Sequence, residues 1–286
     1  MSAPELLVDG LGFGEGPRWR TETDGSARLY FSDFLQRRVF SLEEVGELTV
    51  EAELDDWPSG LGWLPDGRLL VVSMHQRQVL RRESDGSFAV HADLSRVAAG
   101  PANDMVVAAD GTAYVGNFGS DLMVGEERRP ARLSVVRPDG TVTAADTDLQ
   151  FPNGSVITAD GRTLIVGETL AARYTAFDIA PDGSLGASRL WAEVPGRSPD
   201  GCTADAEGAI WFADASAPEV VRVREGGEIT EVLRFPQTCY ACALGGADGR
   251  TLYVLTCSST PKPDLPVGSG QLWRVRVDVP KGDARP

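Results

Sequence analysis

Histidine and cysteine are scarce in this chain of 286 residues, which contains two histidines and four cysteines. The sequence also lacks a Gly-x-Ser-x-Gly elbow and a Gly-x-x-x-x-Gly-Lys phosphate loop. A Ser-His-Asp hydrolase or a nucleotide enzyme would therefore lack its usual motif. His91 follows an edge-strand pattern and is expected to be exposed. His75 ends the apolar run Leu69–Met74 and is expected to line a substrate-binding channel rather than to act in catalysis.

Cys239 and Cys242 form a Cys-x-x-Cys pair, but the chain has no second such pair and no nearby pair of histidines. A structural zinc site needs those additional ligands. Both cysteines lie in a segment with the character of a buried strand, where free thiols behave as small apolar side chains. We therefore expect the two to be buried free thiols.

Long apolar runs and a secretory segment are also missing. No run approaches the roughly 18 residues that a membrane span requires, and the N-terminus has no basic region followed by an apolar core. These absences predict a cytoplasmic protein with reduced cysteines. The net charge of −15 disfavours nucleic acids and anionic membranes as partners, because both carry phosphate. The simpler interpretation of this negative charge is that it keeps the protein soluble. The alternative interpretation is an acidic surface that attracts cations.

What the sequence does contain is a repeat. An X-Gly turn before a β-rich run recurs every 40 to 50 residues or so, the period of a four-stranded propeller blade, at Asp24-Gly25, Asp66-Gly67, Asp110-Gly111, Asp160-Gly161, Glu207-Gly208 and Asp248-Gly249. A second set of turns falls between these, at Val45-Gly46, Asp85-Gly86, Asp139-Gly140, Asp182-Gly183 and Gly226-Gly227. Two hairpin turns per period imply four antiparallel strands per unit. The sequence thus predicts an all-β fold, a six-bladed β-propeller that forms one domain over residues 1–286.

The strand after each first turn is almost wholly apolar, as in Leu69–Val72 and Thr251–Leu255. Such a strand suits the interior of a blade, and we expect it to be the inner strand beside the central channel. Strands after the second turns alternate and carry charge, as in Val220–Arg224, which suits the blade edges. The segment Glu5–Val8 is expected to supply a closing strand to the last blade.

Four short motifs carry oxygen-bearing side chains next to turns: Glu15 in GEGP, Asn103 in PAND, Asn153 in FPNG and Asp200 in SPDG. Each motif alone is ordinary turn chemistry. Taken together with PDGCTADAEGAIWFAD, they resemble the SMP-30/gluconolactonase/luciferin-regenerating-enzyme-like family of six-bladed propeller hydrolases. The resemblance extends from about Glu5 to Val279.

The resemblance implies that Glu15, Asn103, Asn153 and Asp200 surround one divalent cation in the central channel. Ligands of this type, all oxygen and half of them neutral, favour Ca²⁺, with Mg²⁺ and Mn²⁺ as alternatives and Zn²⁺ less suited in the absence of His or Cys. Asp104 has two interpretations, as an acceptor that orients the Asn103 amide or as an ordinary turn carboxylate.

A cation in the channel would polarise a carbonyl group and stabilise the developing oxyanion. Asp200 is the ligand best suited to a second role, as the base that deprotonates water or as the nucleophile itself. The resemblance implies a small lactone as the substrate. Two alternatives stay open: another metal-dependent reaction, such as phosphotriester or aryl-ester hydrolysis or a non-hydrolytic step, and a non-enzymatic calcium-binding propeller.

The motifs specify the identity of the substrate less closely than they specify the metal ligands. Sugar-lactone members of the family carry an Arg two positions before the Asn ligand, where this chain has Pro101. The loss of this fork of donors, which suits polyols, disfavours a gluconolactone-like substrate. Asp121 keeps an acidic residue where those members contact substrate, and Asn103 is expected to contact it as well as the metal. The segment Asp121–Arg132 is either a lid over the channel or a solvated loop.

Overall fold

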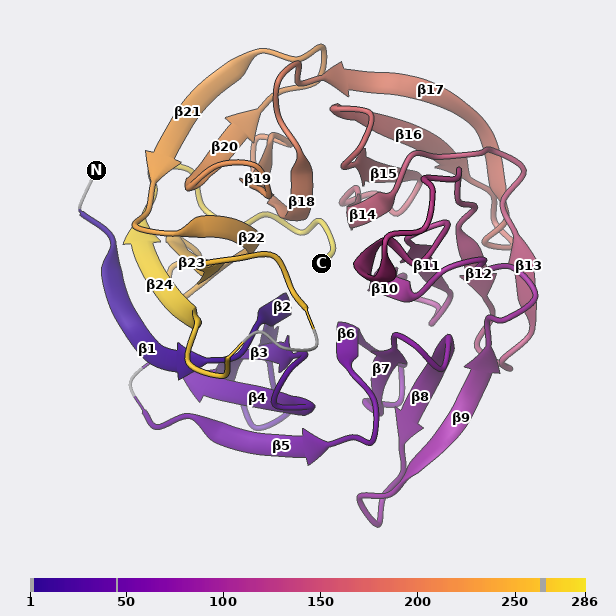
Figure 1. The fold of residues 1–286 in the computed structure, drawn as a ribbon, viewed down its shortest axis with the longest axis horizontal. Helices are drawn as coiled ribbons and strands as arrows, with labels where there is room; N and C mark the ends of the chain where they lie inside the picture. The colour runs from indigo at the N-terminus through magenta and orange to yellow at the C-terminus, as the bar shows by residue number, and fades with distance from the viewer. Residues whose placement is uncertain (1–2, 45, 263–265) are drawn as a thin grey trace.

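The computed structural model describes residues 3–44, 46–262 and 266–286 of the chain. Its strands form six sheets of four antiparallel strands each, and the sheets stand around a central axis as the blades of a propeller (Figure 1). The predicted fold class is therefore confirmed. Within the described residues, the helical structure is a 3-10 turn, η1 (Leu122–Val124), and no helix has the length and apolarity that crossing a bilayer requires.

Each blade contributes one strand to each of four concentric rings. The innermost strands, which contact one another around the axis, are β2 (Gly14–Thr21), β6 (Pro58–Trp63), β10 (Ala102–Val107), β14 (Pro152–Ile157), β18 (Pro199–Ala204) and β22 (Thr238–Gly245). The second strands are β3 (Ala27–Asp33), β7 (Leu69–Ser73), β11 (Ala113–Asn117), β15 (Thr163–Glu168), β19 (Ile210–Asp214) and β23 (Thr251–Cys257).

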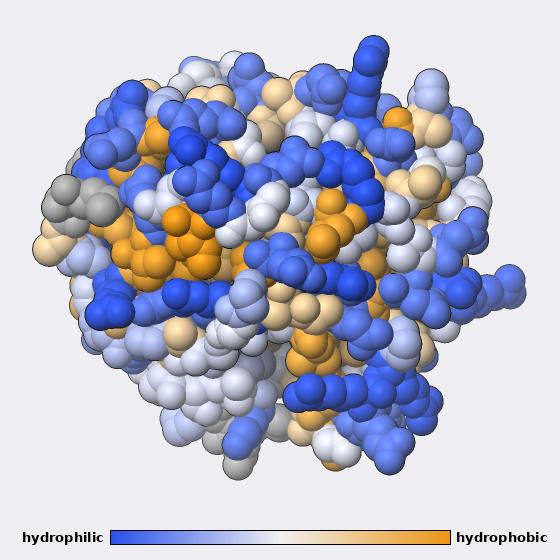
Figure 2. All heavy atoms as spheres, turned by 90° about the horizontal axis from the view of Figure 1, so that it is seen from above, coloured by the Kyte–Doolittle hydropathy of each residue, from blue (hydrophilic) through white to orange (hydrophobic). Residues whose placement is uncertain are grey.

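The outer half of each blade is shorter or more exposed. The third strands are β4 (Arg38–Glu43), β8 (Gln78–Arg82), β12 (Ser134–Val136), β16 (Arg173–Ile179), β20 (Glu219–Val223) and β24 (Gly270–Arg276). The outermost strands are β5 (Thr49–Glu53), β9 (Phe88–Asp93), β13 (Val142–Ala144), β17 (Leu185–Glu193), β21 (Ile229–Arg234) and β1 (Glu5–Leu11). Ion pairs such as Arg38–Glu53 and Arg189–Glu225 lie along this rim. When the propeller is viewed at 90° to Figure 1, hydrophilic side chains separate the apolar patches on its surface (Figure 2).

The prediction that the strands after the first turns are innermost is wrong. Those strands are buried on both faces, as β7 and β23 are throughout, but they are the second strands of their blades. The segments before the turns lie at the axis. These segments are rich in glycine and polar residues, because little room remains where six strands converge, so they carry a weaker apolar signal.

The turn chemistry read from the sequence is confirmed. All six glycines of the first turn set adopt positive φ angles, as do Gly86, Gly140, Gly183, Gly226 and Gly227 of the second set. This conformation is strained for residues that carry a Cβ atom. The predicted turn at Val45-Gly46 includes Val45, which lies outside the described residues.

The last blade is built from both ends of the chain. β1 pairs antiparallel with β24, so that the sheet order is β1-β24-β23-β22. Glu5 faces Arg274 in the register, and its carboxylate accepts two hydrogen bonds of 2.9 Å from the guanidinium group. The predicted closing strand at Glu5–Val8 is confirmed and extends to Leu11.

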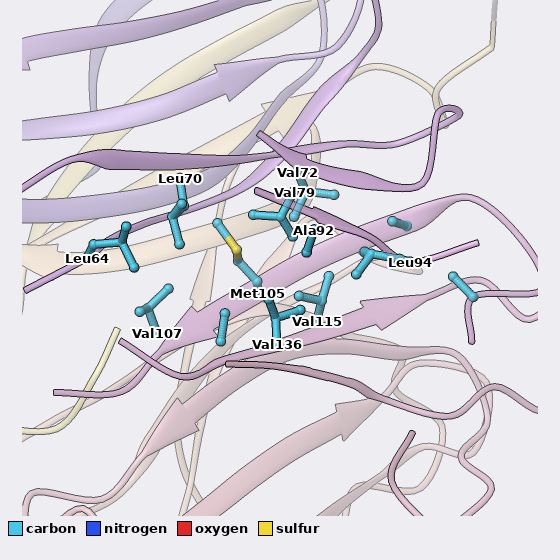
Figure 3. Close-up of a cluster of buried hydrophobic side chains, with 13 residues drawn as sticks. Leu64, Leu70, Val72, Val79, Ala92, Leu94, Met105, Val107, Val115 and Val136 are labelled. Atoms are coloured by element: carbon cyan, nitrogen blue, oxygen red, sulfur yellow. The ribbon is translucent and has the colours of Figure 1, made fainter. Parts of the chain in front are cut away.

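The hydrophobic core lies mainly between neighbouring blades. Figure 3 shows one such interface, in which Leu70 and Val72 of β7 face Met105 of β10 and Val115 of β11. These side chains are buried almost completely. Because each blade buries both of its faces against its neighbours, the positions of the innermost strands are fixed from both sides.

The C-terminal tail crosses one end of the channel. Backbone hydrogen bonds of 2.8 Å join the N–H of Lys281 to Gly249, the N–H of Ala206 to Pro280 and the N–H of Arg285 to Ile157. These partners lie at or beyond the ends of β22, β18 and β14. We call this the tail end of the channel, and the opposite end, where the innermost strands begin, the site end.

Candidate active site

The four predicted ligand residues come together at the site end. Glu15, Asn103, Asn153 and Asp200 are each the second residue of an innermost strand, namely β2, β10, β14 and β18. All four side chains are buried, with exposed fractions of 3–6%. They line one cavity of about 320 Å³. Residues separated by nearly 200 positions therefore share one site because they occupy the same place in different blades.

Glycines next to two of these residues allow the inner strands to approach each other. A Cβ atom on Gly154 would lie 2.3 Å from the carbonyl oxygen of Asp200, and one on Gly201 would lie 2.5 Å from the Cβ of Ala241. A side chain at either position would push the neighbouring strand away. The glycines of the PNG and PDG motifs thus keep Asn153 and Asp200 close together.

The two carboxylates of the site are in an environment that disfavours their charge. Burial, and then the charges of Asp200 and Asp104, raise the pKa of Glu15 well above its usual value. Burial, and then the charge of Asp104, raise the pKa of Asp200 in the same way. Moreover, the Oδ1 atom of Asp200 is buried and has no hydrogen-bond partner. A bound cation would relieve both conditions.

The two amides have their polar atoms arranged by neighbouring hydroxyl groups. Asn153 donates its Nδ2 hydrogen to Oγ1 of Thr169 at 3.2 Å, and Thr169 donates in turn to the carbonyl oxygen of Pro199 at 2.7 Å. This arrangement leaves the Asn153 carbonyl oxygen as the atom available to a ligand. Oδ1 of Asn103 accepts a 3.2 Å hydrogen bond from Ser59 and retains a second lone pair.

This donor set fits a hard divalent cation. It comprises two carboxylates and two amide oxygens, a composition that suits Ca²⁺, Mg²⁺ or Mn²⁺ better than zinc. No group of three or more His, Cys, Asp or Glu side chains suitable for a metal occurs in the described ranges. The orphaned Asp200 oxygen and the two raised carboxyl pKa values are the features of this chain that a cation would satisfy.

Asp104 does not hold the Asn103 amide, contrary to one of its two sequence interpretations. Its Oδ1 atom accepts hydrogen bonds from Nη2 of Arg18 at 2.5 Å and from the N–H of Met105 at 2.8 Å. Arg18 also donates to the carbonyl oxygens of Leu61 and Met105. Both charged side chains are more than 90% buried. Together they form a buried ion pair beside the four ligand candidates.

His75 and Asp121, which we expected to contact the substrate, are not among the residues that line the cavity. Nδ1 of His75 lies 2.8 Å from Oδ1 of Asp56, a contact that raises the pKa of the imidazole. Asp121 accepts a hydrogen bond from the N–H of Met123 and thereby caps η1. Leu122 and Met123, at the start of the segment considered as a lid, do line the cavity.

His91 is buried rather than exposed, so that prediction is wrong. Its exposed fraction is 9%, although it lies on the outermost strand β9. The turn at Gly140 of the next blade packs against the backbone of His91, which the strand pattern of one blade cannot reveal. Burial, and then the charge of Arg81, lower the pKa of its imidazole. The prediction of free thiols is confirmed, since Cys239 and Cys242 are free and buried.

Sequence reasoning missed several residues of the site. Ser59 is the second residue of β6, in the motif Pro58-Ser59-Gly60, and so occupies the place that Asn153 and Asp200 have in theirs. Tyr240 lies at the start of β22 and also lines the cavity. The shared Pro-x-Gly pattern could have revealed Ser59. Nothing in the sequence pairs Thr169 with Asn153, because that contact depends on the turn after β15.

Two larger hollows, of about 650 and 780 Å³, lie at the tail end beside residues 281–286. They lie between the C-terminal tail and the blade turns, and the four ligand candidates do not line them. The smaller cavity at the site end is therefore the candidate active site.

Comparison with known proteins agrees with this architecture. A pentonolactonase of Haloferax volcanii is 31% identical over 297 aligned positions, which cover 98% of this chain and 95% of that protein. A gluconolactonase of Xanthomonas campestris has a TM-score of 0.74 at 25% identity, with 97% of this chain and 89% of the other covered. Regucalcin of Agrobacterium tumefaciens, a calcium-binding protein, has a TM-score of 0.82 at 22% identity, with 98% and 95% covered.

The sequence profile of the SMP-30/gluconolactonase/LRE-like region matches residues 13–258. The match takes in all six innermost strands and the four buried oxygen-bearing side chains at their starts. The chain therefore belongs to the SMP-30/gluconolactonase/LRE-like family.

Proposed function

We propose that this protein is a divalent-metal-dependent lactonase, which opens the ring of a lactone to give a hydroxy acid. The observation that carries the proposal is the pair of buried carboxylates, Glu15 and Asp200, which share a cavity with two amides and form no ion pair with any cationic side chain in the described part of the chain. The 31% identity to a pentonolactonase over nearly the whole of both proteins supports the reaction class.

Glu15, Asn103, Asn153 and Asp200 would hold the cation, with Ca²⁺ the best match to their oxygen atoms and Mg²⁺ or Mn²⁺ as alternatives. When bound, the ion would supply Lewis-acid polarisation of the lactone carbonyl group. Thr169 and Ser59 keep the two amides in place through the hydrogen bonds described above. The side chains around the cavity limit the access of bulk water, which strengthens electrostatic interactions inside it.

Asp200 is the proposed base. Its Oδ1 atom has no hydrogen-bond partner within the protein, so this carboxylate oxygen is available to accept a proton from water. Asp200 takes a proton from water as the water oxygen bonds to the carbonyl carbon. The ring C–O bond then breaks, and the proton passes to the departing alkoxide oxygen. Direct attack by Asp200 on the carbonyl carbon is the alternative role.

A pH-indicator assay over a panel of lactones, with calcium or manganese and with EDTA, tests this proposal. We expect acid release that EDTA abolishes and added metal restores. Calorimetric titration of the same preparation reports whether metal is bound. No acid release from any lactone by metal-bound protein would overturn the proposal. Turnover of phosphotriesters or aryl esters would then identify another hydrolase, and binding of metal without turnover of either class would identify a non-enzymatic calcium-binding propeller.

A further inference from the structure

We infer that the site takes lactones that carry an apolar substituent, alkyl or aryl, rather than polyhydroxylated sugar lactones. The inference rests on the proposed lactonase function and concerns the part of the substrate that does not react. It separates this chain from the pentonolactonase that it resembles.

Aromatic side chains from several blades form the walls of the cavity. The ring of Phe13 lies 4.6 Å from that of Tyr240 and 5.2 Å from that of Phe34, between centroids. On another part of the wall, Phe118 and Phe151 stack with their centroids 4.4 Å apart. All five residues line the same cavity as Glu15 and Asp200. Such walls favour apolar groups, because these groups leave water without losing hydrogen bonds.

Among the residues that the structure describes, few polar groups could receive a polyol. Apart from the four ligand candidates and the Tyr240 hydroxyl, the described polar side chains that line the cavity are Thr169, Thr260 and Lys262. The Thr169 hydroxyl already donates to Pro199 and accepts from Asn153. A sugar lactone has several hydroxyl groups, and each one buried without a partner weakens binding. The cavity therefore discriminates against sugar lactones.

Two features that could have contacted sugar hydroxyls are not available for that purpose. Position 101, where the resemblance places an arginine in sugar lactonases, is a buried proline whose carbonyl oxygen accepts from the N–H of Phe118. The carboxylate of Asp121 caps η1 through Met123. The same short turn places the apolar side chains of Leu122 and Met123 on the cavity wall.

The backbone at Phe151 is strained in a way that serves this wall. Phe151 has a φ angle of 61°, in the left-handed region that aromatic residues seldom adopt. The other non-glycine residues with positive φ in the described ranges, Arg37, Arg77 and Ala172, all lie in turns between second and third strands. Phe151 instead directly precedes β14 and the ligand candidate Asn153.

Neighbouring groups hold this strained conformation in place. The N–H of Gln150 donates to the buried carboxylate of Glu168 at 2.7 Å, and the carbonyl oxygen of Phe151 accepts from the N–H of Thr169 at 3.1 Å. The carbonyl oxygen of Gln150 accepts from Leu170. A strained residue that its surroundings fix so completely is typical of ligand-binding positions. We therefore assign Phe151 as a specificity-determining residue.

The first test compares δ-decalactone with unsubstituted δ-valerolactone and a pentonolactone, D-xylono-1,4-lactone. Each methylene or methyl group that becomes buried should raise kcat/KM about fourfold. δ-Decalactone has five more carbon atoms than δ-valerolactone, so its kcat/KM should be higher by up to about 1,000-fold. We expect the pentonolactone to be the poorest of the three substrates. A kcat/KM for the pentonolactone equal to or above that for δ-decalactone would overturn the inference and leave the lactonase proposal intact.

The second test replaces part of the wall. Phe151→Ala should raise KM for δ-decalactone about tenfold more than KM for δ-valerolactone, because only the longer substrate reaches the ring. Leu190→Ala, which removes an exposed apolar side chain from β17, is the matched control and should change neither value. Met123→Ala provides a second variant of the wall should Phe151→Ala fold poorly. Equal changes for the two substrates in both wall variants would contradict the assignment.

A direct measurement of binding tests the substrate preference separately from the proposed lactonase reaction. Calorimetry with Asp200→Asn measures the affinity for δ-decalactone and for the pentonolactone without turnover. Tighter binding of δ-decalactone supports the inference even if the unaltered protein hydrolyses no lactone, in which case only the proposed function fails. Tighter binding of the pentonolactone, or binding of neither compound, overturns the inference.

Discussion

Two neighbouring groups of buried charges in the central channel are compensated in opposite ways. At the site end, Glu15 and Asp200 are buried without a cationic partner, and their carboxyl pKa values are raised. A short way along the channel, Arg18 and Asp104 are buried as an ion pair, with three backbone carbonyl groups completing the donors of Arg18. The tail end is then crossed by residues 280–286. The chain thus pairs the buried charges of Arg18 and Asp104 with each other and leaves Glu15 and Asp200 without an ion pair among the described residues.

This difference shows how a repeated architecture acquires a function. The six innermost strands are equivalent in position, and the residue near the start of each one can face the axis. Oxygen-bearing side chains occupy this place in four blades in a form suited to a cation, while Ser59 and Tyr240 occupy it in the other two. Uncompensated charge in a rigid frame is the condition under which a bound ion contributes most.

The largest effect is expected on the rate of lactone hydrolysis, from a substitution at the site end of the channel. Asp200→Asn preserves the shape of the side chain but cannot accept a proton, so the rate of lactone hydrolysis at saturating metal should fall by about 10²–10⁴. Asp148, which forms an exposed ion pair with Arg132, provides the matched control. Asp148→Asn should leave the rate of lactone hydrolysis unchanged. Full activity of Asp200→Asn would remove Asp200 from proton transfer and leave it as a ligand alone.

The next effect should come from the ion pair. Arg18→Met leaves the Asp104 carboxylate buried without its partner, which should lower the free energy of unfolding by about 3–5 kcal/mol. Adding Asp104→Asn to this variant should recover part of the loss, since the buried charge is then removed. Urea unfolding of the two variants measures both quantities. Equal free energies of unfolding for the single and the double variant would show that the charges of Arg18 and Asp104 contribute nothing to stability beyond the packing of their side chains.

A smaller effect is expected from the tail end. A variant that ends at Val279 loses the three backbone hydrogen bonds of 2.8 Å to Gly249, Ala206 and Ile157, at about 0.5–1.5 kcal/mol each. Thermal unfolding should therefore occur at a lower temperature, while lactone hydrolysis at moderate temperature should persist. Loss of activity in a variant that remains folded would show that the tail contributes to the site itself.

The smallest expected effect is a change in the stability of the metal-free protein with pH. Because the pKa of Glu15 is raised in the folded protein by burial and then by Asp200, the folded state binds more protons than the unfolded state. In EDTA, this contribution to stability is present at low pH and is lost as the pH rises from the ordinary carboxyl range through the raised pKa. The stabilisation by added calcium should therefore grow with pH. Unfolding temperatures measured with and without calcium from about pH 5 to 8 check this, and a constant difference would contradict it.

Much of the fold could be predicted from the sequence, because hairpin turns depend on local chemistry. The glycines of Asp66-Gly67 and Asp160-Gly161 mark turns that the structure contains. The ligand candidates were found through a resemblance that depends on their motifs. The order of strands within a blade was not predictable from apolarity, because β6 and β14 pack by close backbone approach instead of bulky side chains. The aromatic wall was also missed, since its members precede, follow or lie within different strands and have no common spacing.

The pairing of β1 with β24 has a consequence for biosynthesis. Glu5 and Arg274 are separated by 269 positions, so β1 is synthesised long before β24, its partner in the last blade. Until then, β1 has no sheet to join, and the last blade has an open edge along β24. The ring therefore closes only after the residues of β24 have been synthesised, and contacts of such long range form slowly. A ribosome that stalls before residue 270 would release a chain with five complete blades and an unpaired N-terminal strand, a species that cellular quality control can recognise by its exposed edges.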